Sequence, residues 1–301
     1  MKLSRFVIQF FILLFALGTS VFFIELKYKT YKAPADYLFE NYNAVKNDSS
    51  LIIIGNSHLG EFHKLFPASA YKVINFSIGG QDLFREYTVI HKLLAQPNKI
   101  KKIMLGLDYD IIGYNQVLSG QDYIDKQYYK YVDTLYEYSA INCAISSLSF
   151  FRANRDISFL FKKPVPEENK PEINFIPLTT AKNLNAEDCK NRAMEHTAIK
   201  FNKALIAENS QLLEKLIALC KTKKIELILL NLPKSNCYRS YSNAENIQLG
   251  KNKIIELLQK HQLIYYDLYD DTGFFDDDFT DYDHLNEKGI KKVYQKLNYA
   301  F

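Results

Sequence analysis

Short apolar runs alternate with segments of helical character along most of this chain, and this alternation is the feature that most constrains its fold. Each run is bounded by polar or turn-forming residues and is too short for a typical buried helix. The five runs lie within SSLIIIGN (49–56), YKVINFS (71–77), KIKKIMLGLDYDI (99–111), IELILLNLP (225–233) and LIYYDLY (263–269). Strands that are separated by helices predict a sheet of mostly parallel strands.

The segments between the runs carry helical signals. Residues 82–95 place Leu83, Tyr87, Ile90 and Leu94 on one face of a helix, as expected for a helix that packs on a sheet. Further helical stretches are expected near 58–66, 187–222 and 243–261, and from about Asn286. The element order predicts an α/β fold, namely a three-layer α/β/α sandwich with a mostly parallel, doubly wound, flavodoxin-like sheet.

A stretch without charged side chains precedes this pattern. Residues 6–24, FVIQFFILLFALGTSVFFI, are about long enough to cross the hydrocarbon core of a membrane as one helix. We expect residues 1–25 to form an uncleaved N-terminal transmembrane signal anchor. A cleaved signal peptide is the alternative, because Ala16, Gly18 and Ser20 offer small residues for a cleavage site.

The rest of the chain divides where the composition changes. Residues 26–48 are expected to be a connector and residues 49–301 one large domain. Within this domain, residues 111–185 break the alternation, being rich in tyrosine and then in proline, and we expect an insertion or a lid there. With 301 residues, 48% of them hydrophobic, the chain can bury a sizeable core.

Charge and cysteine content exclude some classes of protein. The chain has 38 basic and 34 acidic residues, a balance too even to indicate a nucleic-acid partner. Its four cysteines are scattered and form no CxxC pair, so a zinc site is not expected, whereas one or two disulfides are allowed. We expect neither a metal nor an organic cofactor. The cysteines are Cys143, Cys189, Cys220 and Cys237.

Residues with the chemistry of a nucleophilic site follow two of the expected strands. Ser57 lies at the end of the first strand, and the segment FTDYDHLNEKG follows the last one. The carboxyl ends of parallel strands share one edge of a sheet, so both segments should meet there. Asp281 stands three residues before His284, close enough to orient an imidazole that takes a proton from the serine. The glycines of the turn SIGGQD leave backbone N–H groups for an oxyanion.

These motifs resemble those of the SGNH/GDSL hydrolase superfamily, in its membrane-anchored branch that handles acyl groups. GNSH at 55–58 is similar to the first motif block, Gly79 or Gly80 to the second, and DYDHLNEKG at 281–289 to the last. The resemblance covers roughly residues 50–110 and 225–298. It implies that Ser57 is the nucleophile, His284 the general base and Asp281 its partner. The amides of Ser57 and Gly80 would form the oxyanion hole.

One block departs from the pattern of the family. Where the family often has an asparagine of the oxyanion hole, this chain reads GLDY with Asp108 in its place. A carboxylate at that position would repel an oxyanion. We therefore expect another donor, Asn231 or alternatively Asn115, or else weak catalysis.

The resemblance implies a membrane-anchored, extracytoplasmic serine esterase or O-acyltransferase. It would act on acyl esters, acetyl above all, of a cell-envelope polysaccharide through a Ser-His-Asp triad. A transferase would need a donor across the membrane, which implies a multi-span membrane O-acyltransferase as partner. The alternative is a weakly active or inactive envelope binding protein, or an accessory subunit of such a system, because Asp108 is unfavourable.

Each site residue also has a structural interpretation. Ser57 could instead be the N-cap of the helical segment that follows it. The other histidines are expected to lie on the surface, although His58 could line the pocket; they are His58, His63, His91, His196 and His261. Asp276, Asp278 and Glu287 fit positions 1, 3 and 12 of an EF-hand register, but Asp281 stands where that loop needs glycine. Calcium binding is therefore not favoured.

Overall fold

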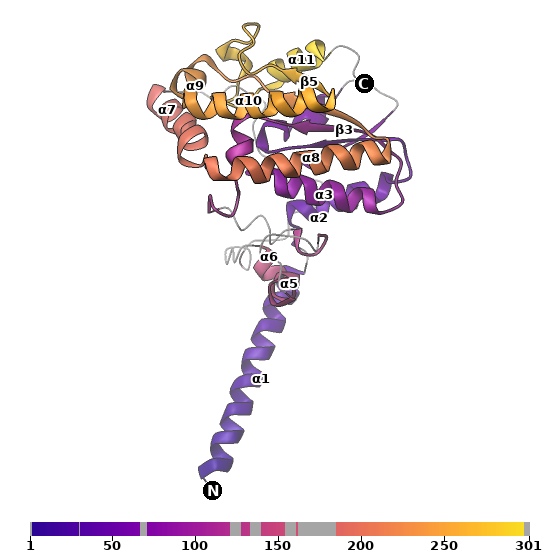
Figure 1. Ribbon diagram of the computed structural model, residues 1–301. Coiled ribbons are helices and arrows are strands. Elements are labelled where there is room, and N and C mark those ends of the chain that lie inside the picture. The colour runs from indigo at the N-terminus through magenta and orange to yellow at the C-terminus, as the bar shows by residue number, and fades with distance from the viewer. Residues whose placement is uncertain are drawn as a thin grey trace. The chain divides into compact units, whose positions relative to one another are not determined.

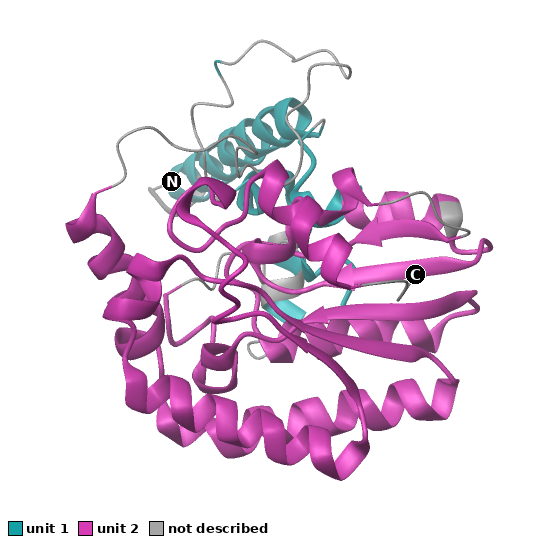
Figure 2. Cartoon of the chain, turned by 90° about the horizontal axis from the view of Figure 1, so that it is seen from above, with its two compact units in different colours: residues 1–37, 125–171 teal, residues 38–124, 172–301 magenta. Residues whose placement is uncertain are grey.

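The chain forms two compact units in a computed structural model, which describes residues 2–29, 31–66, 71–120, 128–132, 140–153, 161 and 185–297. The first unit comprises residues 1–37 and 125–171, and the second comprises residues 38–124 and 172–301 (Figure 2). The expected strands and all of the candidate site residues belong to the second unit.

The second unit contains a five-stranded sheet in the order β2-β1-β3-β4-β5, in which every neighbouring pair is parallel. The strands are β1 (Ser50–Ile54), β2 (Lys72–Asn75), β3 (Ile100–Gly106), β4 (Glu226–Asn231) and β5 (Ile264–Asp267). This order is that of flavodoxin-like sheets: the chain adds β2 on one side of β1 and the later strands on the other, so the strand order reverses between β1 and β3. The structure confirms the predicted α/β fold with helices on its sheet (Figure 1).

Burial of both sheet faces explains why the strands read as continuous apolar runs. All five residues of β1 are buried, and Leu51 and Ile53 belong to a cluster with Val293 of α11. Because side chains alternate along a strand, Ile52 and Ile54 point to the opposite face, and both are also buried. A sheet that is covered on both faces is the middle layer of the three-layer arrangement that the alternation of strands and helices predicted.

Ten helices flank or precede the sheet within the described residues. They are α1 (Lys2–Tyr28), α2 (Pro34–Val45), α3 (Leu83–Ala95), α5 (Ala140–Ser147), α6 (Ser149–Arg152), α7 (Ala186–Met194), α8 (Ile206–Lys223), α9 (Asn236–Tyr241), α10 (Ala244–His261) and α11 (Glu287–Lys296). Helices α3, α8 and α10 lie side by side in this order (Figure 1). Asp82, Asn243 and Asn286 begin α3, α10 and α11 as N-caps whose side chains accept backbone N–H groups.

The predicted helical stretch 187–222 is wrong as a single helix. Helix α7 ends at Met194, a wide helical turn follows over Glu195–Ile199, and α8 begins only at Ile206. The break has a packing cause, because the buried ring of Phe201 contacts Gly113 so closely that a Cβ there would lie 2.6 Å from it. The Asn202 N–H also donates to the Gly113 carbonyl at 2.8 Å.

Helix α1 is long and apolar enough to cross a membrane. The span Arg5–Tyr28 has a mean hydropathy of 2.4, and its apolar window is fully exposed in the structure. The hydroxyl groups of Thr19 and Ser20 donate to backbone carbonyls one turn earlier, so these polar groups are satisfied within the helix. Length and composition are consistent with the expected anchor, whose topology stays a prediction.

Hydrogen bonds tie the end of α1 to other segments of the first unit. Glu25 accepts the Ser149 and Phe150 N–H groups at the start of α6, at 2.7 and 3.4 Å. Buried Asp36 accepts two bonds of 2.8 Å from Arg152. Burial opposes the charge of Asp36, but its hydrogen bonds and the Arg152 guanidinium lower the pKa of this carboxyl below its ordinary value.

The predicted domain limits stay predictions. The segment 26–48, expected as a connector, contains α2, and the expected insertion 111–185 includes α5 and α6. Much of that insertion, including residues 162–184, lies outside the described residues.

A disulfide between Cys189 and Cys237 joins α7 to α9, and it spans 48 residues of sequence. One bridge is within the number that the four cysteines allowed. It ties together two helices that precede and follow α8 and β4, so it closes a long loop of the second unit.

Replacing Cys189 and Cys237 by serine should lower the free energy of unfolding by about 2–4 kcal/mol, because the bridge restricts the unfolded chain. Thermal unfolding of the full-length protein in detergent, followed by circular dichroism, measures the change. A reductant should lower the melting temperature of the wild type and leave the double variant unaffected. Equal melting temperatures for both proteins would contradict the prediction.

Candidate active site

The end of β1 presents Ser57 at the edge of the sheet. Gly55 follows β1 and Gly106 ends β3, and the two approach so closely that a Cβ on Gly55 would lie 3.3 Å from the Gly106 Cα. A tight 3₁₀ turn, Ser57–Leu59, follows, and its N-cap is Asn56, whose side chain accepts the His58 N–H at 3.0 Å. The capping role expected as the alternative for Ser57 therefore belongs to its neighbour.

The loop before α11 presents His284 to the same edge. Asn286 caps α11 and also donates to the Asp277 carbonyl at 2.8 Å, which folds the loop onto the start of the helix. The Thr280 N–H donates to the His284 carbonyl at 2.8 Å. Gly289 explains why the motif ends in glycine, since a Cβ there would lie 2.3 Å from the Asp278 carbonyl oxygen.

The structure brings Ser57, His284 and Asp281 into one chain of hydrogen bonds. His284 Nε2 lies 2.9 Å from Ser57 Oγ, and His284 Nδ1 lies 2.8 Å from Asp281 Oδ2. Burial acts against the charge of Asp281, but the hydrogen bond from His284 prevails and lowers the pKa of this carboxyl below its ordinary value. An ionised Asp281 can hold the imidazole so that Nε2 accepts the serine proton.

Only some of the expected oxyanion donors lie beside Ser57. Gly80 and Gly79 line the cavity that contains Ser57, and a Cβ on Gly79 would lie 3.7 Å from Ser57 Cβ. Gly80 has φ of 74°, a left-handed conformation that suits glycine. Asn231 does not line this cavity; it is the last residue of β4, and its side chain donates to Asp267 at 3.1 Å. The alternative Asn115 also lies outside the cavity lining, and its side chain accepts the Leu118 N–H.

Two depressions adjoin Ser57 and His284. A cavity of about 300 Å³ contains Ser57, and a second depression of about 450 Å³ contains His284 and Asp281. Arg192 and Glu195 line both. The first is also lined by Asn56, His58, Gly79, Gly80, Gln81, Asp110, Ile111, Tyr114, His196 and Lys200. The second is also lined by Asp188, Asn191 and Tyr282.

Asp108 does not face the cavity as an isolated carboxylate. It is buried, lines neither depression, and accepts hydrogen bonds from Asn56 at 3.2 Å and His58 Nδ1 at 2.5 Å. The ammonium of Lys234, whose side chain is 1% exposed, lies 3.4 Å away. Burial opposes the charge, but Lys234 and His58 lower the pKa of Asp108 far below its ordinary value. The charge that seemed unfavourable for an oxyanion is therefore compensated.

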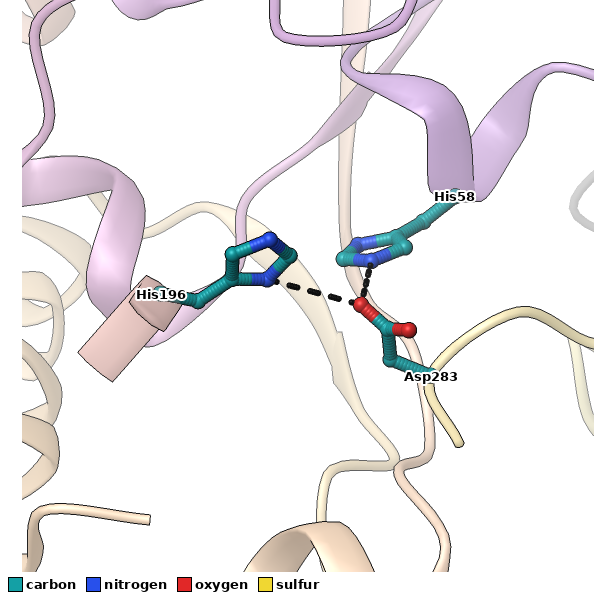
Figure 3. Close-up of side chains that lie close together, drawn as sticks. All are labelled: His58, His196 and Asp283. Carbon is teal, nitrogen blue, oxygen red and sulfur yellow. Dashed lines mark hydrogen bonds and ion pairs between the residues drawn. The ribbon is translucent and has the colours of Figure 1, made fainter. Parts of the chain in front are cut away.

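Asp283 joins two histidines in the interior of the site (Figure 3). Its Oδ2 lies 3.0 Å from His58 Nε2 and 3.4 Å from His196 Nδ1, and Arg192 Nε donates to both of its oxygens at 3.2 Å. Burial opposes the charge of Asp283, but His284, His58 and Arg192 lower the pKa of this carboxyl well below its ordinary value. The carboxylate is therefore ionised at neutral pH.

His58 lines the cavity, which is the alternative that the sequence had left open for it. The expectation that His196 lies on the surface is wrong, because its side chain lines the same cavity and is 17% exposed. His58 is 8% exposed, and its partners Asp108, Asp283 and Lys234 come from distant segments. The position of His58 directly after Ser57 in the sequence was a weak signal that His58 belongs to the site. The sequence offered none for His196 or Lys234, which reach the site through a helical turn and a strand end far apart in the chain.

One atom each of His58, His196 and Asp283 could act as metal ligands, since these atoms lie within 4.8 Å of one another. Lys234 Nζ, however, lies 2.8 Å from His58 Nδ1, and Arg192 already pairs with Asp283. These two cations compensate the carboxylates, so a divalent ion would meet positive charge. The arrangement suits proton and charge stabilisation better than metal binding.

The acidic segment before His284 does not have the arrangement of a calcium loop. Asp278 is buried and accepts from Lys292 at 2.5 Å and from the Phe275 N–H at 2.8 Å. Glu287 pairs with Lys291 at 2.5 Å. Two of the three carboxylates that fit the EF-hand register, Asp278 and Glu287, are therefore engaged within the protein.

Comparisons with known proteins give one family model and solved structures that are similar to this chain. A model of an uncharacterised family matches residues 182–300, less than half of the chain, and no curated protein matches. A solved structure described as a candidate acylhydrolase, from Bacteroides fragilis NCTC 9343, is 13% identical with a TM-score of 0.43, and the match covers 87% of this chain and 94% of that one. One described as a candidate platelet activating factor, from Streptococcus pneumonia, is 14% identical with a TM-score of 0.46, and the match covers 95% and 96%. At this similarity neither carries an argument about chemistry.

His196 should make the stability of the fold depend on pH. Burial lowers the pKa of His196 to about 3, from an ordinary value of 6.5, although Asp283 acts in the opposite direction. As the pH falls below 6.5, the unfolded chain gains a proton that the folded protein does not, so stability decreases. His196→Gln should remove about 1.4 kcal/mol of this decrease per pH unit.

Urea unfolding of the wild type and the His196→Gln variant, at about pH 7.5 and about pH 5, measures the difference between the two slopes. Comparing slopes separates His196 from the carboxyl groups, which titrate in both proteins. The same pH dependence in the two proteins would show that His196 is not held neutral.

Proposed function

We propose that the protein is a membrane-anchored, extracytoplasmic serine esterase or O-acyltransferase of the SGNH type. The observation that supports it most is the chain of hydrogen bonds from Ser57 through His284 to Asp281, beside a cavity at the carboxyl edge of a parallel sheet. Ligands of such sheets bind at this edge. The side chains carry the proposal, independently of any likeness to other proteins.

In the proposed reaction, Ser57 Oγ attacks the carbonyl carbon of an ester while its proton passes to His284 Nε2. The negative charge moves to the carbonyl oxygen, for which the N–H groups of Ser57 and Gly80 are the proposed donors. The imidazolium, stabilised by Asp281, then gives its proton to the leaving alcohol as the ester bond breaks. Water or an acceptor hydroxyl resolves the acyl-enzyme by the same steps in reverse.

We assign the two parts of the ester to the two depressions. Apart from Ile111 and Tyr114, the lining of the cavity around Ser57 is mostly polar, which favours a short acyl group such as acetyl over a long apolar chain. The leaving alcohol must reach His284, which lines the second depression. There Asn191, Asp188 and Tyr282 offer groups that bind hydroxyls, so an acylated glycan of the cell envelope is the substrate that we propose.

Two features support the proposed location. Helix α1 has the length and composition of a membrane span. The Cys189–Cys237 bridge favours an oxidising compartment outside the cytoplasm. If the reaction is transfer rather than hydrolysis, the acyl donor must come across the membrane, and a multi-span membrane O-acyltransferase is the partner that we propose.

Ser57→Ala should abolish labelling by a fluorophosphonate probe and lower turnover of p-nitrophenyl acetate by about 10³-fold or more, because the nucleophile is lost. His284→Ala should lower turnover by about 10²–10⁴-fold. Gel fluorescence and absorbance assays on the detergent-solubilised protein measure both effects. Folded wild-type protein that is neither labelled nor active would favour a binding protein instead.

Asn191→Ala should lower kcat/KM for acetylated xylan about 3- to 10-fold more than for p-nitrophenyl acetate, because one hydrogen bond to the sugar side is lost. Lys190→Ala, an exposed position of α7 that lines neither depression, is the matched control. If Asn191→Ala changes both substrates by the same factor, the second depression does not hold the alcohol.

A further inference from the structure

His284 faces two carboxylates rather than one. Asp281 Oδ2 lies 2.8 Å from His284 Nδ1, and Asp283 Oδ1 lies 3.6 Å from the same atom. The side chain of Asp281 is 35% exposed, whereas that of Asp283 is 0% exposed. A charge shielded from water acts more strongly on a neighbour than one that water and salt can screen.

Three side chains from two segments of the chain hold Asp283. Arg192 of α7 donates to both of its oxygens, His58 of the 3₁₀ turn contacts it at 3.0 Å, and His196 of the wide turn lies at 3.4 Å. Tyr238 of α9 lies 3.3 Å from His196 in turn. Arg192 lies one helical turn after Cys189, so the disulfide supports the segment that carries it.

The contacts continue behind His58. Its Nδ1 lies 2.5 Å from Asp108 and 2.8 Å from the Lys234 ammonium, and its ring centroid is 4.9 Å from that of His284. A continuous series of side chains therefore leads from Lys234 and Asp108 through His58 and Asp283 to the histidine beside Ser57. Each buried carboxylate in this series has a cation of its own.

We propose that Asp283 is a positioning residue for His284: a second, buried carboxylate, held by Arg192 and His58, that fixes the ring and stabilises its imidazolium form. The catalytic sense of this role rests on the proposed function, whereas the effect on the ring does not. Asp281 bonds the ring directly, and Asp283 supplies a negative charge that water cannot reach.

Asp283→Asn in the full-length protein tests this role. The variant should lower kcat/KM for p-nitrophenyl acetate about tenfold or more, mainly through kcat, because the imidazolium loses a stabilising charge. For the same reason the acid limb of the pH profile of kcat/KM should move to lower pH. If Asp283 had only a structural role, its replacement would lower the rate and leave the acid limb of the pH profile at its wild-type pH.

A second measurement does not depend on turnover. Histidine-labelled protein in detergent allows the ring signals of His284 to be followed by NMR as a function of pH, and their midpoint should move down in Asp283→Asn. Asp277→Asn is the matched control, because Asp277 lies in the same loop, is 68% exposed and pairs only with Lys288 among the described contacts. Asp277→Asn should change neither the acid limb of the pH profile nor the NMR midpoint of His284.

Asp283→Asn leaves the partly buried Arg192 cation beside a neutral group, which can destabilise the fold. The double variant Asp283→Asn/Arg192→Gln removes both charges of the pair, and it should show a smaller downward movement, because the cation that opposes the imidazolium is lost together with the carboxylate. A folded variant with the wild-type acid limb and midpoint would overturn the proposal. A wild type without turnover or labelling would instead refute the proposed function, and the NMR midpoints would still decide the role of Asp283.

Discussion

The hydrogen bond between His284 and Ser57 is the interaction on which the site depends. It joins residues 227 positions apart in sequence, and it exists only because parallel strands end at one edge of the sheet. The β1 end can carry Ser57 into a tight turn because Gly55 and Gly106 allow the strands to approach. The loop before α11 can carry His284 to meet it because Asn286 and Gly289 close that loop on the helix.

Charges around this bond are arranged in compensated pairs. Burying an ion pair costs desolvation free energy, and well-packed apolar residues often stabilise a fold as much or more. Directly beside the histidines, Asp108 forms an ion pair with Lys234, and Asp283 forms one with Arg192. Such a costly arrangement next to Ser57 and His284 is more readily explained by the chemistry of the site than by stability of the fold.

The sequence allowed the sheet to be predicted because strands covered on both faces are continuously apolar, and it allowed Ser57, Asp281 and His284 to be chosen because their motifs are local. It could not decide whether Asn231 reaches the cavity, since the position of Asn231 relative to Ser57 depends on the strand order, and its role as an oxyanion donor stays a prediction. Arg192, His196 and Lys234 reach the site only through tertiary packing, and no short motif contains them. The break at Phe201 was missed because its cause, Gly113, lies far away in sequence.

The cap that Glu25 forms on α6 has a consequence for α1, the helix that is long and apolar enough to cross a membrane. Two backbone N–H groups of α6 are bound by one carboxylate near the end of α1, so α1 cannot rotate freely about its own axis relative to α6. Each apolar side chain of α1 therefore points in a fixed direction around the helix axis relative to α6. Any protein that associates with this helix inside a bilayer would meet one defined stripe of it, and lipid would cover the remainder.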